Sequence, residues 1–460
     1  MSEIKKSGER EQLASRIGFL LISAGCAIGL GNVWRFPFIT GKYGGAAFVF
    51  VYLLFLLLLG LPIMVMEFVI GRAGRKNIAG ALRALEPKNS KWHIIGYLGI
   101  LGNLILMMFY TTVAGWSFAY LYREIKGAFI GLSPEEIGKA FDLFLGNTGE
   151  LIFWMGLAVA LGFFICSLGL QKGVEKAGKF MMSGMFIMLL ILVFKAVTLP
   201  GASAGISFYL KPDFSNFSWE GVYAAMGQAF FTLSLGIGSM AIFGSYIGKE
   251  RSLTGESMHV MALDTLIALL AGMVIFPTAF AFGVDVGTGP GLVFVTLPNI
   301  FNQMLGGQIW GSLFFMFLTF AAMTTVVAVF ENLMAFTIDE WGWKRKKASV
   351  INAGVVFILS LPCIFGFGPW SSFAPLGGET VILDLEDFIL SNNLLPIGSL
   401  VIVLFCTYKS GWGWENFIEE ADTGKGVKFP KWLRPYLYIL PLIILVVLIQ
   451  GWIPLLIKLF

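Results

Sequence analysis

Carboxylates inside long apolar segments are the residues of this chain best suited to chemistry. Asp264 lies in the apolar run Val260–Leu266, about one helical turn into its segment. A charged side chain at the centre of a membrane helix costs at least about 2.5–3.5 kcal/mol and needs a partner. We therefore interpret Asp264 as a sodium ligand or a proton site; an aspartate hydrogen-bonded near a helix N-terminus is the alternative. The other ionisable residues in or beside such segments are Glu67, Glu331, Asp339, Asp387 and Arg35.

Neighbouring hydroxyls form a second candidate site. Thr324 and Thr325 follow each other in an apolar segment. Hydroxyl oxygens, together with carbonyls freed by a helix break, make the oxygen cage that a hard cation prefers. Threonine in a membrane helix also commonly bonds its own backbone, so both interpretations stay open. Tyr110 and Phe231 are candidate ligands too, although packing is the commoner role of single aromatic residues in a chain with 15% aromatic residues.

Two interrupted apolar segments must position these groups. One spans Ile17–Ile39 with three glycines between Gly25 and Gly31, and the other spans Val222–Ile247 with Gly236 and Gly238. Glycine is unfavourable in a helix interior by about 1 kcal/mol relative to alanine. Lipid cannot satisfy freed backbone groups, so unwinding is tolerated only around a cavity lined by protein. Two such breaks at corresponding places predict a transporter's binding site.

Composition places the chain in the integral membrane class and excludes a soluble globular protein. It is 57% hydrophobic and 13% charged, with a mean hydropathy of +0.81. Apolar stretches long enough to span a bilayer recur along the whole length. We expect about eleven helices, near 14–38, 44–70, 93–125, 151–169, 174–199, 221–247, 257–283, 308–339, 348–367, 381–408 and 434–459.

Charge placement and the position of the breaks predict the topology. Lys and Arg concentrate in 5–16, 72–91, 172–179 and 344–347, which puts the N-terminus in the cytoplasm and Phe460 outside. The broken segments are the first and the sixth, as expected for an inverted repeat of five plus five helices. We expect a single all-α transporter domain over 1–460, with repeats at 14–199 and 221–408 and an additional helix at 434–459.

The two breaks carry the residues of a family resemblance. Gly25–Asn32 followed by Val33–Pro37, and Gly227–Gly236, resemble the first-helix and sixth-helix signatures of the neurotransmitter:sodium symporters. The resemblance extends over nearly the whole chain. It is greatest to the bacterial branch with eleven helices and the leucine-transporter fold, which includes tyrosine and hydrophobic amino-acid transporters.

The resemblance implies a substrate site between the two breaks. The backbone amides of Leu30 and Gly31, with the hydroxyl of Tyr110, would hold the substrate carboxylate, because the positive end of a half-helix favours an anion. Carbonyls near Ala27, Phe231 and Thr232 would accept from the ammonium group. The substrate-binding residues implied are Ala27, Leu30, Gly31, Leu106, Tyr110, Phe231, Thr232, Ser234, Ile237, Thr325 and Val329, with Val326 beside them.

The resemblance also implies two sodium sites and two gates. The first sodium would bind Ala27, Asn32, Thr232 and Asp264. The second would bind Gly25, Ile28, Ala321, Thr324 and Thr325. Arg35 and Asp387 would form the outer gate. The inner gate would consist of Arg10, Asp339, Ser245 and Tyr246.

Two positions sharpen these implications. Gly29 occupies the place of an aspartate in monoamine transporters, so it leaves room for a substrate that brings its own carboxylate. Asp264 stands where many members have asparagine, and its charge could replace the chloride that animal relatives use. We expect no chloride requirement, with proton return through Asp264 as an option.

The function expected is therefore sodium-coupled uptake of neutral hydrophobic or aromatic L-amino acids by alternating access. The protein would be a multi-pass protein of the inner or plasma membrane, with sodium, an amino acid and the lipid bilayer as partners and no nucleic acid. A proton-coupled amine or small-solute carrier of the same fold is the main alternative, and a receptor or channel is a second. An enzyme is not expected, because no nucleophile–base pair or HExxH motif occurs in the segments.

Overall fold

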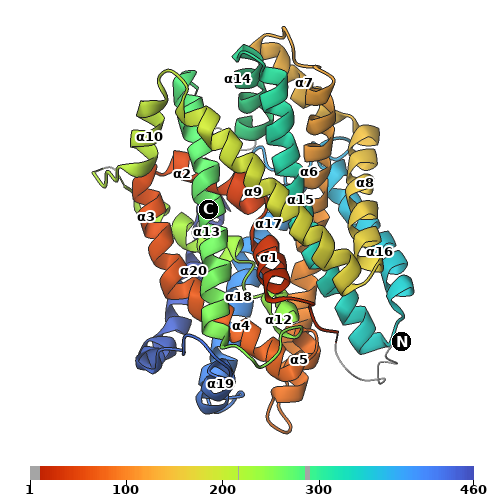
Figure 1. The fold of residues 1–460 in the computed structure, drawn as a ribbon, viewed down its shortest axis with the longest axis vertical. Coiled ribbons are helices and arrows are strands. Elements are labelled where there is room, and N and C mark those ends of the chain that lie inside the picture. The colour runs from red at the N-terminus through yellow and green to blue at the C-terminus, as the bar shows by residue number, and fades with distance from the viewer. Residues whose placement is uncertain (1–10, 216, 285–290, 460) are drawn as a thin grey trace.

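The computed structural model describes residues 11–215, 217–284 and 291–459. Within these ranges the chain is a bundle of helices with no β-strand (Figure 1). Figure 1 places α7 (Pro134–Gly146), α10 (Ala202–Leu210) and α14 (Leu297–Gln303) at one end of the bundle. The short helices α5 (Ile78–Leu85) and α19 (Trp414–Ala421) lie at the opposite end.

Nine continuous helical segments in the described ranges are long and apolar enough to cross a membrane. They are Ala46–Gly74 (α3, η2 and α4), His93–Ile125 (α6), Thr148–Ser167 (α8), Leu170–Val197 (η3 and α9), Leu253–Ala281 (α13), Gly307–Trp341 (α15), Arg345–Phe365 (α16), Ile382–Thr407 (α17, η5 and α18) and Lys431–Ile453, most of which is α20 (Arg434–Leu459). Each lies within a few residues of a predicted span. The protein is therefore an all-α, multi-pass membrane protein, as predicted.

The two remaining predicted spans are the interrupted ones. The first consists of α1 (Arg16–Ala27) and a second part, η1 (Gly31–Arg35) with α2 (Phe36–Lys42), and it bends by 54° at the break. The sixth consists of α11 (Trp219–Thr232) and α12 (Ser239–Gly244), separated by six non-helical residues. Counting the first pair as one span gives ten segments in the described residues that are long and apolar enough to cross a membrane. The predicted eleventh would be the sixth segment, in which α11 and α12 lie on either side of the turn at 233–238.

The core of the bundle surrounds these interrupted segments. In α15, nearly every residue from Ala321 to Thr337 is buried, whereas α8, α9 and α16 have exposed apolar faces such as Phe153, Phe194 and Ile358. A helix that is apolar all round is typical of a membrane span, because its outer face contacts lipid rather than water. Several of the buried polar residues, among them Asn32, Thr232 and Ser234, lie at or beside the two breaks.

Candidate functional site

The first break exposes backbone groups between α1 and η1. Ile28 is extended (φ −73°, ψ 106°), so the helical hydrogen-bond ladder stops there. The Gly29 amide donates to Asn32 Oδ1 at 3.1 Å, and the Leu30 amide donates to the Tyr110 hydroxyl at 2.9 Å. Side chains thus replace the helical partners of the freed amides, as an unwound segment at membrane depth requires.

The second break is a tight turn between α11 and α12. Ser234, Gly236 and Gly238 all have positive φ (50°, 89° and 73°), and a Cβ on Gly236 would collide with the Leu395 carbonyl. Glycine is therefore required at 236 by both conformation and space. The buried Glu67 carboxylate accepts from the Gly236 amide at 2.5 Å and the Met240 amide at 3.2 Å, and so caps the N-terminus of α12.

A small cavity, with about 20 Å³ open to the centre of a water molecule, lies between the two breaks. Eight of the predicted substrate-binding residues line it: Ala27, Gly31, Leu106, Tyr110, Phe231, Ser234, Ile237 and Thr325. The residues that sequence reasoning missed on its wall are Cys26, Leu390 and Leu395; Gly29 also lines it. The lining carries no charged side chain and is mostly apolar.

Three other predicted substrate residues lie outside this lining. Leu30 lines a neighbouring cavity, and Thr232 contacts Asp264. Val329 is fully buried in α15, as is Val326, and neither lines the cavity. Leu390 and Leu395 complete the wall instead, from η5 (Leu390–Leu394) and the start of α18 (Leu395–Thr407).

Gly29 brings the first break against two hydroxyl groups. A Cβ built on Gly29 would collide with Tyr110 Oη and Thr325 Oγ1. A larger side chain at position 29 would therefore occupy the space beside these hydroxyls in the cavity. The glycine keeps that polar corner open.

We call Asn32, Thr232 and Asp264 the carboxylate cluster. Asn32 Nδ2 donates to Asp264 Oδ1 at 2.8 Å, and Thr232 Oγ1 lies 3.2 Å from Asp264 Oδ2. All three side chains are almost completely buried, and Ala27 at the end of α1 lies at the neighbouring cavity wall. The structure thus brings an amide donor from η1 and a hydroxyl donor from α11 to one buried carboxylate of α13.

We call Gly25, Ile28, Ala321, Thr324 and Thr325 the hydroxyl cluster. Thr324 Oγ1 donates to the carbonyls of Ile28 at 3.2 Å and Ala321 at 2.8 Å. Thr325 Oγ1 lies 3.3 Å from the carbonyls of both Gly25 and Ile28. These five oxygens converge from α1 and α15 with no ionised group among them, and hard cations prefer such oxygen ligands.

No group of three or more His, Cys, Asp or Glu side chains able to hold a metal occurs in the described residues. Both clusters therefore differ from a transition-metal site, which would use imidazole or thiolate ligands. Their carbonyl, hydroxyl and single carboxylate oxygens fit a weakly bound alkali ion.

The end of the cavity that carries the predicted outer gate is closed by side chains. Phe231 and Tyr110 line both the cavity and a second space beyond it, with about 180 Å³ open to the centre of a water molecule. The Arg35 guanidinium lies over the Phe231 ring, 4.2 Å from its centroid, and pairs with Asp387 at 3.7 Å. Ser391 Oγ bridges the pair, accepting from Arg35 at 3.2 Å and donating to Asp387 at 2.6 Å.

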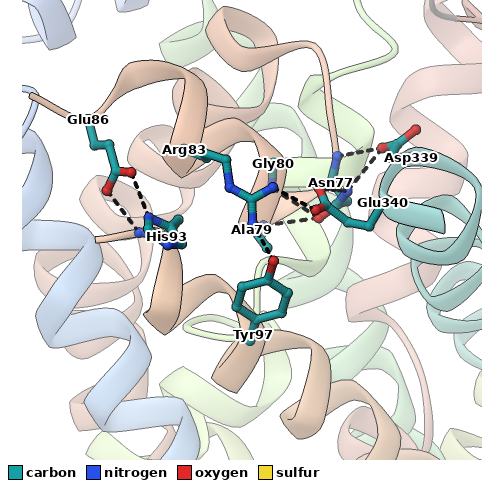
Figure 2. A network of polar contacts seen from close by, with 9 residues as sticks. All are labelled: Asn77, Ala79, Gly80, Arg83, Glu86, His93, Tyr97, Asp339 and Glu340. Carbon is teal, nitrogen blue, oxygen red and sulfur yellow. Dashed lines mark hydrogen bonds and ion pairs between the residues drawn. The ribbon is translucent and has the colours of Figure 1, made fainter. Parts of the chain in front are cut away.

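The opposite end carries the residues predicted for an inner gate. Arg10 lies outside the described residues. Asp339 Oδ2 accepts from the Asn77 amide at 2.8 Å, beside the Arg83–Glu340 pair (Figure 2). Nearby, Glu86 accepts from the backbone amide of His93.

The other two residues of the predicted inner gate lie after α12. The Ser245 hydroxyl donates to the carbonyl of Ile242, and the Tyr246 hydroxyl donates to Glu331 at 3.0 Å. Glu331 is completely buried and forms a two-pronged ion pair with Arg345, both contacts at 2.8 Å. Glu331 is therefore already neutralised by a neighbouring cation.

Comparisons with known proteins agree with this geometry. The model of the sodium:neurotransmitter symporter family matches residues 10–130 and 139–456. An uncharacterised sodium-dependent transporter of Bacillus subtilis, YhdH, is 34% identical, covering 95% of this chain and 97% of that protein. The human sodium- and chloride-dependent taurine transporter is 26% identical, covering 93% and 76%. The crystal structure of MhsT in complex with L-phenylalanine matches with a TM-score of 0.86 and 36% identity, covering 96% and 100%.

Proposed function

The chain belongs to the sodium:neurotransmitter symporter family, and from this premise we propose that it takes up neutral hydrophobic or aromatic L-amino acids without chloride. Members of this family are sodium-coupled symporters rather than enzymes. Sodium and a transported solute are therefore the partners of this multi-pass membrane protein.

The cavity between the two breaks carries the substrate proposal. Its polar corner, formed by Tyr110, Gly29 and the neighbouring backbone amides, is suited to a carboxylate group. The rest of the wall is apolar, including Leu106, Ile237 and Phe231. A charged substrate side chain would lose its hydration there without a compensating partner, so we expect it to be rejected. MhsT, which has a similar fold, was crystallised with L-phenylalanine.

The two oxygen clusters support two sodium sites. One sodium would bind at the carboxylate cluster with the carbonyl of Ala27, and the other at the hydroxyl cluster. Asp264 would balance the charge of the first sodium, and this is the reason for expecting no chloride requirement. A returning proton on Asp264 is part of the same proposal, because the carboxylate is the ionisable group of that cluster.

Alternating access would use the closures at the two ends. Arg35 and Asp387, with Phe231 and Tyr110, would open toward the outside, and the region of Asp339, Ser245 and Tyr246 toward the cytoplasm. We place the protein in the inner or plasma membrane with its N-terminus inside, from the distribution of Lys and Arg. Symmetric repeats at 14–199 and 221–408 would allow two similar packings of the helices, one open to each side of the membrane, as alternating access requires.

Uptake by proteoliposomes tests the proposal. We expect labelled L-tryptophan to accumulate under an inward sodium gradient in gluconate buffer, and not when potassium replaces sodium. Among all twenty amino acids, the neutral hydrophobic and aromatic ones should compete best. Strong competition by lysine or glutamate would overturn the substrate class, and an absolute need for chloride would overturn the role of Asp264. Accumulation driven by a proton gradient alone would favour the proton-coupled amine carrier.

A further inference from the structure

A groove on the outer surface of the bundle lies apart from the transport site. It has about 580 Å³ open to the centre of a water molecule and is bounded by α6, α15 and α16. Its walls are Ile100, Leu104, Leu333, Phe336, Thr337, Trp341, Trp343, Ile351, Asn352 and Val355. Ile351 and Val355 are more than a third exposed. Because these helices span the membrane, the material that meets this groove is lipid or another membrane helix.

Two lysines stand at one end of the groove, on the same helix face as its wall. Lys347, Ile351 and Val355 follow each other at four-residue spacing along α16, so they form one stripe. Lys344 is the residue immediately before α16, three residues from Lys347 in the sequence. A helical side chain leans toward the N-terminus of its helix, which carries the ammonium group of Lys347 beyond the groove's apolar wall.

Aromatic rings support this cationic end. The ammonium of Lys347 lies 4.8 Å from the ring centroid of Trp343, which itself lines the groove. Trp341 stands 4.9 Å from Trp343 and 5.4 Å from Phe336, between centroids. Tryptophans are enriched at the level of lipid headgroups, so this end of the groove has the composition of a membrane interface.

The lysines lack acidic partners, in contrast to their neighbours. Arg345 pairs with Glu331, and Arg83 pairs with Glu340 at the end of α15 (Figure 2). Neither Lys344 nor Lys347 forms an ion pair with any residue that the structure describes. The positive charge at this end of the groove is therefore available to an external anion.

A polar group lies deeper in the groove. Asn352 Nδ2 donates to Thr337 Oγ1 at 3.0 Å, and its second amide hydrogen stays available. Asn352 is five residues beyond Lys347, which corresponds to about 7.5 Å along the helix axis. The groove thus offers a cationic end, then a hydrogen-bond donor, then an apolar wall.

We propose that this groove binds an anionic phospholipid, with its phosphate at Lys344 and Lys347, an ester carbonyl near Asn352 and one acyl chain along Ile351 and Val355. A second copy of the chain fits less well. A twofold dimer axis along the membrane normal would bring this face against itself, and the lysines of the two copies would then repel each other. The proposal does not depend on which solute is transported.

Native mass spectrometry of the full-length protein tests the proposal. The protein in neutral detergent is mixed with equal amounts of phosphatidylglycerol and phosphatidylcholine carrying identical acyl chains. We expect the unmodified chain to retain phosphatidylglycerol in preference to phosphatidylcholine. The double variant Lys344→Gln/Lys347→Gln should lose about 30-fold in affinity for phosphatidylglycerol at low salt, since each lysine near an anionic headgroup contributes several-fold. Its affinity for phosphatidylcholine should change little.

Lys346→Gln is the matched control, because Lys346 is adjacent in sequence but lies about 100° around α16 and starts a different stripe through Val350. Equal loss of phosphatidylglycerol in this control would overturn the proposal in favour of diffuse surface charge. Val355→Trp should fill the groove and weaken both lipids, and unchanged retention would also overturn it. The proposal would also be overturned if the unmodified chain formed a dimer without bound lipid and Val355→Trp dissociated that dimer. If the double variant cannot be purified, Lys347→Gln alone should lose about fivefold in affinity for phosphatidylglycerol.

Discussion

The carboxylate cluster and the hydroxyl cluster flank the same break but differ in charge. Asp264 brings a buried anion to the first, whereas the second has only neutral oxygens from Thr324, Thr325 and three carbonyls. Burying an unpaired charge is costly. Without a bound cation, the carboxylate cluster is therefore less stable than the hydroxyl cluster. With a bound cation, the hydroxyl cluster is the less stable of the two. Removing a ligand should accordingly have different consequences in the two clusters.

The largest effect is expected from Asp264→Asn. The change removes the only charge of the carboxylate cluster, so a sodium ion there would be left without compensation. By analogy with breaking a buried ion pair, at about 3–5 kcal/mol, uptake in gluconate should fall more than about 100-fold. Chloride should restore part of it. Initial rates in gluconate and chloride measure this, and undiminished uptake of the variant in gluconate would show that Asp264 does not balance the ion.

A smaller effect is expected from Thr325→Val in the hydroxyl cluster. The substitution keeps the shape but removes the hydroxyl beside the carbonyls of Gly25 and Ile28. Losing one neutral ligand should raise the half-saturating sodium concentration about tenfold, as for a buried polar group left unpaired. Chloride should not rescue this variant.

Thr319→Val is the control for that change. Thr319 lies on the same helix and is equally buried, but its hydroxyl donates to the carbonyl of Phe315 within α15. Sodium dependence should stay as in the unmodified chain. Equal shifts in both valine variants would mean that helix stability, rather than ion binding, explains the result.

Gly29→Ala tests whether substrate affinity can be changed without changing the ion dependence of the two clusters. The added Cβ would press on the hydroxyls of Tyr110 and Thr325. Both are ends of side chains that can shift, so we expect about a fivefold rise in the half-saturating substrate concentration. The sodium response should move slightly in the direction of Thr325→Val, because Thr325 is shared. A change in chloride dependence would contradict the assignment of the carboxylate cluster.

The smallest effect is expected from Asp387→Asn at the outer closure. The Arg35–Asp387 pair is 3.7 Å long, with side chains 24% and 33% exposed. Pairs of this kind contribute at most about 1 kcal/mol, so uptake should change by less than about fivefold. Sodium and chloride dependence should both be preserved, because neither cluster contacts this pair. A large shift in sodium affinity, measured by the same titration, would contradict that separation.

The spans were readily predicted because lipid imposes a length and an apolar composition on each of them. α6 was predicted at its observed bounds, 93–125, and both breaks fall at the predicted glycines. The turn at Ser234 was not predicted, since nothing in a serine indicates a positive φ. The Ser234 hydroxyl donates to the carbonyl of Cys26 at 3.4 Å, a contact with a distant segment that the sequence alone does not reveal.

The site was harder to predict where its residues come from distant, irregular segments. Leu390 and Leu395 were missed because a π-helical turn, η5, separates them and shifts the face that each presents. Glu67 was recognised only as a charge in need of a partner. Its partners are backbone amides of the turn before α12 (Gly236) and of α12 itself (Met240), which no side-chain pattern reveals.

The cap that Glu67 places on α12 has a mechanical consequence. α12 has only six residues, and an isolated helix of that length is unstable. Its backbone also packs so closely on α4 that a side chain at Gly71 or Gly244 would collide with the opposite backbone. α12 is therefore held against α4 (Leu61–Gly74), while the turn at 233–238 separates it from α11, so a change in the angle of that turn would move α12 together with α4.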